Sequence, residues 1–494
     1  MDALIGYTGY VGSYLATKLK NADLYNSKNI GDIVGKKYDN IYFAGLPATK
    51  WLVNLNPEND LKNMLDIQYL LSTCEIKRFI LISTIDVYDK NKPEQDEDSH
   101  YYTDESYGKH RRIMEQWVID NYNYNILRLP ALFGIGLKKN ALYDILTNNI
   151  TCKINLFDKY QWYYLDDLMD DIKFVITNDI KCINLFSEPI LMKTILNELF
   201  VNEIFPSHDK LTLYDYKSKY FNMYKNDQKY ILIKMNEFIK LWRMIYKLDD
   251  KLVVSNLCWN DDQMALALLN RYSIKHVELA ITRYCGFYDN DTEIMKIKDI
   301  FKEFNIYSLQ SLFYNLDYNV FVDNKQFRDH FIRLGEICEL LNVKRMVFGS
   351  PKNRLIPDNM TNDEVIDIFV NTFQVISSLL PDGIIVCIEH NASEYGCNFL
   401  TTIQSVIDIV TLINRDNIKM NLDTGNAMMM NDIINFNEIY DHVGHIQISA
   451  PNLGNINGMK TLNIGSNYSG KISLEMKLSD DLESNIKTFI MNIK

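Results

Sequence analysis

Positive charge is scarce in this 494-residue sequence, which carries 52 Lys and Arg against 64 Asp and Glu, a formal net charge of −12. Nucleic-acid binders need a basic surface, so this balance argues against nucleic acid as the main partner. Long apolar runs are also missing, since none approaches the roughly 18 residues of a membrane-spanning helix. The opening residues, MDALIGYTGY, lack a basic region followed by an apolar core and therefore predict no secretory signal.

Cysteine pairs in metal or redox spacing are missing as well. The eight Cys residues include no C-x-x-C and follow no regular spacing. This usage predicts reduced thiols, buried as small hydrophobic side chains, in a cytosolic protein. Disorder is excluded as the main state, because 47% apolar and 23% charged residues are close to the globular average. At roughly 100–200 residues per domain, the length predicts two or three domains.

Short apolar runs alternate with helical stretches over about the first 200 residues. Such βαβ order predicts a parallel, doubly wound sheet of the Rossmann type with right-handed crossovers. The expected strands are Ala3–Ile5, 40–43, 78–83, Tyr124–Leu129 and 182–185, and the expected helices are 11–19, 60–73 and 107–121.

The pattern becomes more regular after residue 250, where eight strand-like runs are separated by stretches long enough for one helix. Eight such units in residues 249–494 predict a (β/α)8 TIM barrel, which typically takes about 250 residues. We therefore expect a Rossmann domain at 1–204, a linker or small subdomain at 205–248, and a barrel at 249–494. The eight runs are 252–259, 276–282, 307–314, 345–351, 384–391, 418–425, 445–451 and 471–477.

Three glycines, Gly6, Gly9 and Gly12, stand between the first expected strand and the first expected helix. Glycines at that place permit a tight turn and the close approach of a pyrophosphate to a helix N-terminus. After the presumed second strand, the acidic residue that would bind a ribose 2′-hydroxyl is missing. Ser27 and Lys28 stand there instead, which favours NADP over NAD, although a solvated loop is the alternative.

Residues 1–200 resemble the extended short-chain dehydrogenase/reductase family of NAD(P)-dependent nucleotide-sugar epimerases, dehydratases and reductases. The resemblance depends on the glycine triplet, on STIDVY at 83–88, on Tyr107 and on RLPALFG at 128–134. It implies that Thr84 hydrogen-bonds a substrate oxygen and that Tyr107 is the acid/base.

One position departs from this resemblance. The family pattern is Tyr-x-x-x-Lys, whereas the fourth residue after Tyr107 is Arg111. The family's lysine holds the cofactor ribose and lowers the pKa of the tyrosine. Arginine also supplies a charge, but its fork has a different geometry and does not deprotonate. The first domain is therefore expected to bind the nucleotide, either as an active enzyme or as a cofactor-binding platform.

Polar side chains lie at the ends of four neighbouring barrel runs. Glu389 ends the fifth run, Asp423 the sixth and Glu475 the eighth, while the seventh contains His445 and Gln447. The carboxyl ends of barrel strands form the active-site face, and charged residues in apolar strands are costly unless paired or metal-bound. An oxygen-rich set of this kind predicts one Mg²⁺ or Mn²⁺ ion. We favour Gln447 as the fourth ligand and His445 as a deeper orienting group, with His445 as the alternative ligand and a salt-bridge network as the alternative to a metal.

Residues 250–494 resemble the xylose isomerase-like barrel family of sugar (phosphate) isomerases and epimerases. The resemblance implies that Glu389 and Glu475 bind the metal and move a proton on either side of an enediolate. Two features of the ketose epimerases are absent: Asn426 stands where they have a His, and no Arg follows the seventh run. The related endonuclease IV barrels need several His ligands on strands 2 to 7, which this acidic chain lacks.

The sequence thus predicts a bifunctional carbohydrate-modifying enzyme acting on a sugar, a sugar phosphate or a nucleotide sugar. The barrel would isomerise or epimerise its substrate with a metal, and the first domain would use NAD(P). One alternative makes the barrel the only catalyst, and another is a nucleotide-sensing scaffold without enzymatic activity. A homo-oligomer is a further option that the sequence leaves open.

Overall fold

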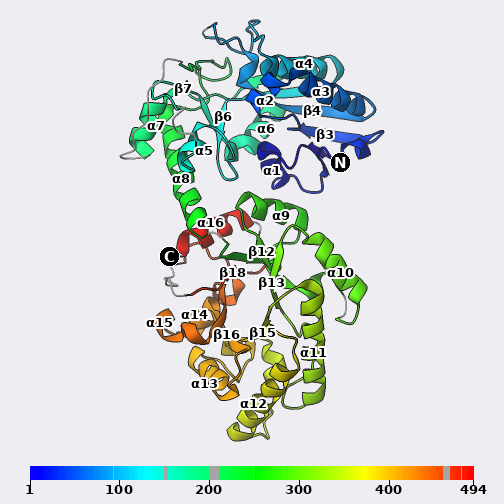
Figure 1. Cartoon of the computed structure of the whole chain (residues 1–494), viewed down its shortest axis with the longest axis vertical. Helices are drawn as coiled ribbons and strands as arrows, with labels where there is room; N and C mark the ends of the chain where they lie inside the picture. Colours follow the sequence, from blue (N-terminus) through cyan, green and yellow to red (C-terminus); the bar gives the residue numbers. More distant parts are fainter. Residues whose placement is uncertain are drawn as a thin grey trace. The chain divides into compact units, whose positions relative to one another are not determined.

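The computed structural model describes residues 1–92, 94–149, 154–199, 211–248, 250–285, 288–459, 468–479 and 481–493. The chain divides into two units (Figure 1). The first comprises Met1–Arg243 and Gln263–Tyr272, and the second comprises Met244–Asp262 and Ser273–Lys494. Of the linker expected at 205–248, residues 205–210 lie outside the described part, and helix α8 (Gln228–Lys247) occupies most of the remainder.

A parallel sheet forms the centre of the first unit, as expected. Its strand order is β2-β1-β3-β4-β5-β9, so β2 and β3 flank β1 on opposite sides. This change of direction is the topological switch point at which open α/β sheets bind ligands. The strands are β1 (Ala3–Ile5), β2 (Asp23–Tyr25), β3 (Lys37–Phe43), β4 (Glu75–Thr84), β5 (Tyr124–Leu129) and β9 (Cys182–Asn184).

Both faces of this sheet are buried, because successive side chains of each strand point to opposite sides. On one face, Ala3 and Ile5 pack with helices α3 (Pro57–Ser72) and α4 (Ser106–Asn121). On the other, Leu4 packs with α1 (Tyr10–Ala16) and α6 (Leu168–Thr177). The three helices expected in this half are therefore found as α1, α3 and α4, with ends that differ by at most three residues.

Several short elements of the first unit were not expected. Strand β6 (Ala131–Phe133) pairs with β8 (Trp162–Tyr164), and β7 (Lys159–Tyr160) pairs with β10 (Ile190–Leu191). Strands of two or three residues are too short to show periodicity in a sequence. The other helices of this part are α2 (Lys50–Leu55), α5 (Ala141–Leu146) and α7 (Met192–Leu199).

The second unit contains a closed barrel of eight parallel strands, which confirms the predicted TIM barrel. Every expected run from 252–259 to 471–477 overlaps one of these strands, although β13 and β17 begin two residues before their runs. Each strand is paired with its neighbours in chain order. The strands are β11 (Leu252–Ser255), β12 (His276–Ala280), β13 (Asn305–Gln310), β14 (Arg345–Phe348), β15 (Ile385–Glu389), β16 (Ile418–Asp423), β17 (Val443–Ile448) and β18 (Ile472–Leu474).

Helices alternate with these strands along the chain. An aromatic core of Phe313, Phe331, Phe348 and Phe373 joins β14 to helices α11 and α12. None of the helices in the described ranges has the length and apolar character that crossing a lipid bilayer requires. Helix α9 (Asp262–Arg271) follows β11 in the chain, but its residues from Gln263 on belong to the first unit. The helices of the second unit are α10 (Asp291–Ile300), α11 (Asn324–Leu341), α12 (Asn362–Leu379), α13 (Ile403–Ile413), α14 (Thr424–Met429), α15 (Phe436–Ile439) and α16 (Leu482–Asn492).

Candidate functional sites

The glycine loop after β1 packs tightly against the loop after β3. Gly6 has a φ of +89°, and a Cβ atom on it would lie 2.4 Å from the carbonyl oxygen of Ala44. A Cβ atom on Gly12 would lie 2.0 Å from the carbonyl oxygen of Gly6. Gly9 has more room, since its Cβ would lie 3.2 Å from the nearest atom. Gly6 and Gly12 thus shape the loop, while Gly9 is exposed.

Ser27 and Lys28 are exposed in the loop that follows β2. Asn26 fixes this loop, because its Oδ1 accepts the backbone N–H of Lys28 at 2.8 Å and its Nδ2 donates to the Tyr7 hydroxyl at 3.1 Å. Since Tyr7 belongs to the glycine loop, both expected cofactor contacts lie at the same sheet edge as the glycines. The preference for NADP stays a prediction.

Thr84 and Tyr107 are brought together at the carboxyl end of β4. Thr84 is the last residue of β4, and Tyr107 lies in the first turn of α4, where its backbone N–H donates to Asn54 Oδ1 at 2.9 Å. Burial raises the pKa of Tyr107, while the charge of Arg111 and a hydrogen bond with Thr84 act to lower it. The side chains of Thr84 and Tyr107 are therefore close enough to form a hydrogen bond with each other, and their roles stay a prediction.

The guanidinium group of Arg111 forms its hydrogen bonds with other groups of the protein. The guanidinium lies over the Tyr107 ring, 4.5 Å from the centroid, and donates to Asp60 Oδ2 at 2.7 Å and Oδ1 at 3.3 Å. It also donates to the carbonyl oxygen of Pro47. Arg111 therefore keeps a positive charge beside Tyr107, but these N–H groups join α4 to α3 and are already engaged. The sequence could not show this pairing, because Asp60 is 51 residues away.

Sequence reasoning missed two charged residues near Tyr107. Lys50 Nζ lies 2.5 Å from Asp86 Oδ1, and the Tyr214 hydroxyl donates to the same oxygen at 2.9 Å. The charges of Asp86 and Lys50 raise and lower the pKa of Tyr107, respectively. The only sequence signal for Asp86 was its place in STIDVY, and nothing marked Lys50.

In the barrel, three asparagine side chains hold the carboxylate of Glu389 at the end of β15. Asn391 and Asn426 donate to its Oε1 at 2.8 and 2.9 Å, and Asn421 donates to its Oε2 at 3.3 Å. Gly349, which follows β14, makes room for the group, since a Cβ there would lie 3.0 Å from Glu389 Oε2. Glu389 is thereby fixed at the active-site face of the barrel.

Asp423 is both the last residue of β16 and the N-cap of α14. Its Oδ1 accepts the backbone N–H of Asn426 at 2.6 Å, and its Oδ2 accepts the Ser449 hydroxyl at 2.6 Å. The capping bond satisfies a helix N–H that would otherwise be unpaired. Burial raises the pKa of Asp423 despite these hydrogen bonds.

Glu475 completes a cluster of three carboxylates, which we call the acidic triad (Glu389, Asp423 and Glu475). Burial, followed by the charges of Asp423 and Glu389, raises the pKa of Glu475 well above its ordinary value. Burial and the charge of Asp423 likewise raise the pKa of Glu389 to about 8. The three groups therefore lie within electrostatic reach of one another and oppose each other's ionisation.

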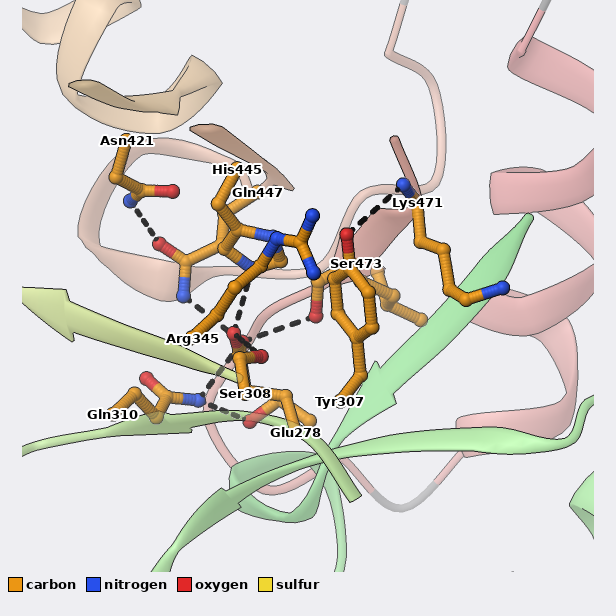
Figure 2. Close-up of polar contacts among 12 residues, drawn as sticks. Glu278, Tyr307, Ser308, Gln310, Arg345, Asn421, His445, Gln447, Lys471 and Ser473 are labelled. Carbon is orange, nitrogen blue, oxygen red and sulfur yellow. Dashed lines mark hydrogen bonds and ion pairs between the residues drawn. The ribbon is translucent and has the colours of Figure 1, made fainter. Parts of the chain in front are cut away.

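Gln447 and His445 occupy different levels of β17. Gln447 pairs in register with Asp423, whereas His445 pairs with Asn421, two residues deeper in the barrel. Figure 2 shows both side chains directed at Glu278 of β12: His445 Nε2 lies 2.7 Å from its Oε2, and Gln447 Nε2 donates to its Oε1 at 2.9 Å. The Oε1 of Gln447 accepts from Asn421 at 2.5 Å. The structure thus places Gln447 level with the triad and His445 beneath it.

Glu278 is a buried carboxylate whose part in this network the sequence did not reveal. It also accepts hydrogen bonds from Ser308 at 2.7 Å, Ser473 at 3.0 Å and Gln310 at 3.2 Å. Burial opposes its ionisation, but the neighbouring His445 and these hydrogen bonds lower its pKa. Glu278 therefore lies at the centre of a hydrogen-bond network that orients Gln447 and His445 (Figure 2).

Two family models match this chain in separate stretches. The NAD dependent epimerase/dehydratase family matches residues 21–184, and the xylose isomerase-like TIM barrel matches residues 266–480. The first stretch contains Thr84, Tyr107 and Arg111 but begins after the glycine loop. The second contains the acidic triad and Gln447.

Solved structures resemble each half of the chain at low identity. UDP-N-acetylglucosamine 4-epimerase from Methanobrevibacter ruminantium M1, in complex with UDP-N-acetylmuramic acid, is 14% identical, with 49% of this chain and 97% of that chain covered and a TM-score of 0.42. An AP endonuclease, family 2, from Brucella melitensis is 13% identical over 48% and 97% of the two chains, with a TM-score of 0.40. D-psicose 3-epimerase from Clostridium cellulolyticum H10, with D-tagatose, is 16% identical over 48% and 90%, with a TM-score of 0.38.

At these identities the similarities concern the fold alone. No curated protein matches the chain. The matched stretches agree with the sheet and the barrel that the structure contains. The chain therefore contains one stretch that matches the model of the NAD dependent epimerase/dehydratase family and a second that matches the model of the xylose isomerase-like TIM barrel.

Proposed function

We propose that the barrel is a metal-dependent sugar isomerase or epimerase. The acidic triad carries this proposal, because three buried carboxylates at the ends of β15, β16 and β18 gain nothing for folding from one another's charge. They lie at the carboxyl ends of the strands, where TIM barrels have their active sites. A salt-bridge network, the alternative, would require cations in contact with these groups. The hydrogen bonds recorded for the triad come from Asn, Ser and Gln side chains and from backbone N–H groups.

The chemistry of the triad fits a divalent cation. As the side chains are placed, no three His, Cys, Asp or Glu residues in the described ranges form a ready metal group. The carboxylates of Glu389, Asp423 and Glu475 nevertheless supply the oxygen ligands that Mg²⁺ and Mn²⁺ prefer, and a cation would offset the repulsion that raises their pKa values. Gln447, level with Asp423, would add a neutral oxygen. When bound, the cation would polarise the carbonyl and hydroxyl oxygens of a sugar.

Glu389 and Glu475 are the proposed proton carriers. One carboxylate takes the proton from the carbon that bears a hydroxyl group next to the carbonyl, which leaves an enediolate. The other carboxylic acid returns a proton, either to the neighbouring carbon, giving the isomer, or to the opposite face of the same carbon, giving the epimer. The asparagine side chains hold Glu389 so that its carboxylate stays in reach of the substrate carbon.

For the first unit, we propose binding of NAD(P) at the switch point of the sheet, beside the glycine loop. The family match and the close approach at Gly6 and Gly12 support this assignment. Tyr107 would exchange the hydroxyl proton of a sugar or nucleotide sugar while Thr84 holds the same oxygen. The cofactor would accept or return the hydride.

A second candidate makes the first unit a cofactor-binding platform and leaves catalysis to the barrel. The observation that favours it is the engaged fork of Arg111, which bonds Asp60 and Pro47. A purely non-enzymatic scaffold is disfavoured by the acidic triad. Tyr107→Phe distinguishes the two candidates. If the first unit is a platform, the variant keeps full barrel activity and loses no other activity, whereas an active first unit would lose its NAD(P)-dependent turnover.

Proton exchange in D₂O tests the barrel proposal. The protein with Mg²⁺ or Mn²⁺ is incubated with a panel of aldoses, ketoses and their phosphorylated and acidic forms, and carbon-bound deuterium is measured by NMR. We expect exchange with at least one sugar, a loss of at least 100-fold in Glu475→Gln, and near-normal exchange in the control Lys477→Gln, which changes an exposed residue two positions away. Exchange that persists unchanged in Glu475→Gln would contradict the assignment.

A further inference from the structure

Buried polar atoms without partners gather next to Glu389. Arg354 ends the short 3-10 helix η7 (Pro351–Arg354) after β14, and His390 directly follows Glu389. Among the described residues, Nε and Nη1 of Arg354, both ring nitrogens of His390 and Oδ1 of Asn421 are buried and have no hydrogen-bond partner. Buried polar groups are normally paired, so such a concentration calls for a physical reason.

Arg354 is the most unusual member of this group. Its side chain is 0% exposed, and its Nη2 donates to Asn391 Oδ1 at 2.6 Å. The structure records no ion pair between this guanidinium and a carboxylate of the described residues, although a buried charge is costly unless it is paired. The chain therefore carries a desolvated cation whose recorded hydrogen-bond partners are the Asn391 amide and the Cys397 thiol, while the charge of Glu389 also acts on it.

His390 lies close to this cation. Burial, followed by the charge of Arg354, lowers the pKa of His390. The imidazole is also 0% exposed. A neutral imidazole supplies one hydrogen-bond donor and one acceptor. Together with Nε and Nη1 of Arg354, these atoms form a group of buried polar atoms without partners.

A single amide connects Arg354 to the proposed catalytic carboxylate. Asn391 accepts from Arg354 with its Oδ1 and donates with its Nδ2 to Glu389 Oε1 at 2.8 Å. Both Arg354 and His390 follow strand ends at the active-site face, as the acidic triad does. A group bound to Arg354 would thus lie a few atoms from a carbon that Glu389 can reach.

We propose that Arg354 and His390 form a subsite for an anionic substituent of the substrate, a carboxylate or a phosphate. Its oxygens would take the place of Asn391 Oδ1 on the guanidinium, whose planar fork matches the geometry of both anions. This inference rests on the proposed function and narrows it: the barrel acts on sugar acids or sugar phosphates in preference to neutral sugars. The positive charge also compensates for bringing an anion toward the acidic triad.

Calorimetric titration tests the subsite. The full-length protein with Mg²⁺ is titrated with D-gluconate, D-glucose 6-phosphate and neutral D-glucose. We expect one of the two anions to bind at least 10-fold more tightly than D-glucose, and the anion that does so identifies the substituent as carboxylate or phosphate. Arg354→Gln should lose this difference, whereas Lys352→Gln, which removes an exposed cation two residues earlier, should keep it.

The subsite would be overturned if the wild-type protein bound the three compounds with equal affinity. It would also be overturned if Arg354→Gln and Lys352→Gln lost the same amount of affinity for the anion. Arg354→Lys guards against misfolding of Arg354→Gln, because lysine keeps the charge and loses the fork. Its circular dichroism spectrum should be normal and its affinity for the anion about 10-fold weaker. Failure of the proposed function is a separate result: in that case no sugar of any kind shows proton exchange, whereas failure of the subsite alone leaves exchange of neutral sugars intact.

Discussion

Glu278 and Glu389 are buried carboxylates in the same barrel, yet their pKa values move in opposite directions. Glu278 is surrounded by hydroxyl, amide and imidazole groups that favour its charged form. Glu389 also accepts three amide hydrogen bonds, but burial and Asp423 raise its pKa to about 8. Since both residues are buried glutamates, their immediate neighbours decide the direction in which the pKa of each one moves.

Glu115 gives a pH prediction at this scale. Burial alone would raise its pKa, but Arg128, whose Nη2 lies 2.7 Å from Glu115 Oε2, and the Ser83 hydroxyl lower it below the ordinary value of 4.5. Its stabilising contribution is therefore complete above pH 4.5 and is lost as the pH falls through the lower folded pKa. Glu115→Gln should cost about 3–5 kcal/mol at pH 7, because it leaves Arg128 buried without a counter-charge.

Urea unfolding at pH 7, 5, 4 and 3 measures this effect. The difference in unfolding free energy between wild type and Glu115→Gln should be constant from pH 7 to 5 and should shrink below pH 4.5. A difference that stays constant down to pH 3 would show that Glu115 does not titrate in this range.

The glycine loop gives a second prediction for single residues. Gly12→Ala places a Cβ atom against the Gly6 carbonyl oxygen and should destabilise the first unit by roughly 1–3 kcal/mol. Gly9→Asp has more room, so the fold should persist, but its negative charge would repel a pyrophosphate. Thermal unfolding and the fluorescence of bound NADPH distinguish these outcomes. Normal NADPH binding by Gly9→Asp would remove this loop from the cofactor site.

At the scale of elements, α3 and α4 are joined by a buried ion pair that also sets the position of Tyr107. The carboxylate of Asp60 in α3 accepts hydrogen bonds from the guanidinium of Arg111, and His110 Nδ1 lies 2.8 Å from the same carboxylate. The guanidinium in turn covers the Tyr107 ring. Arg111, which stands in place of the lysine of Tyr-x-x-x-Lys, thus holds two helices together in a way that a lysine would do less well.

Arg111→Lys tests this role. A lysine ammonium cannot donate to both Asp60 oxygens and to Pro47 in the same geometry, so the variant should lose about 1–3 kcal/mol of stability. Guanidinium unfolding checks the result, with the exposed Lys109→Arg as the control on the same helix. Unchanged stability in Arg111→Lys would show that the ion pair is not what holds α3 to α4.

The long, periodic elements could be predicted from the sequence, and the short ones could not. The eight barrel strands and the helices α1, α3 and α4 follow from apolar runs and helical periodicity. Strands β6, β7, β8 and β10 have two or three residues and gain their stability from pairing with distant segments. The residues of the acidic triad could be predicted because they stand at the ends of apolar runs. Glu278, Asp60 and Lys50 could not, because their contacts are with residues far away in the sequence.

For the whole molecule, the chain holds two candidate sites on two units, one beside the glycine loop and one at the mouth of the barrel. The residues of each site come from a single unit, so each should tolerate loss of the other. Gly9→Asp should leave the metal content unchanged, and Asp423→Ala should leave NADPH binding unchanged. Measuring both properties in both variants checks this, and loss of both in either variant would mean that the sites depend on one another.

The metal content of the barrel tests the central claim most directly. Purified wild-type protein, dialysed against Mn²⁺ and then against buffer, is analysed for bound metal together with Asp423→Ala and the control Glu394→Ala, which removes an exposed carboxylate near Glu389. The acidic triad predicts about one Mn²⁺ per chain in wild type and Glu394→Ala, and at least a 10-fold lower content in Asp423→Ala. Equal metal content in wild type and Asp423→Ala, or no metal in either, would contradict the account.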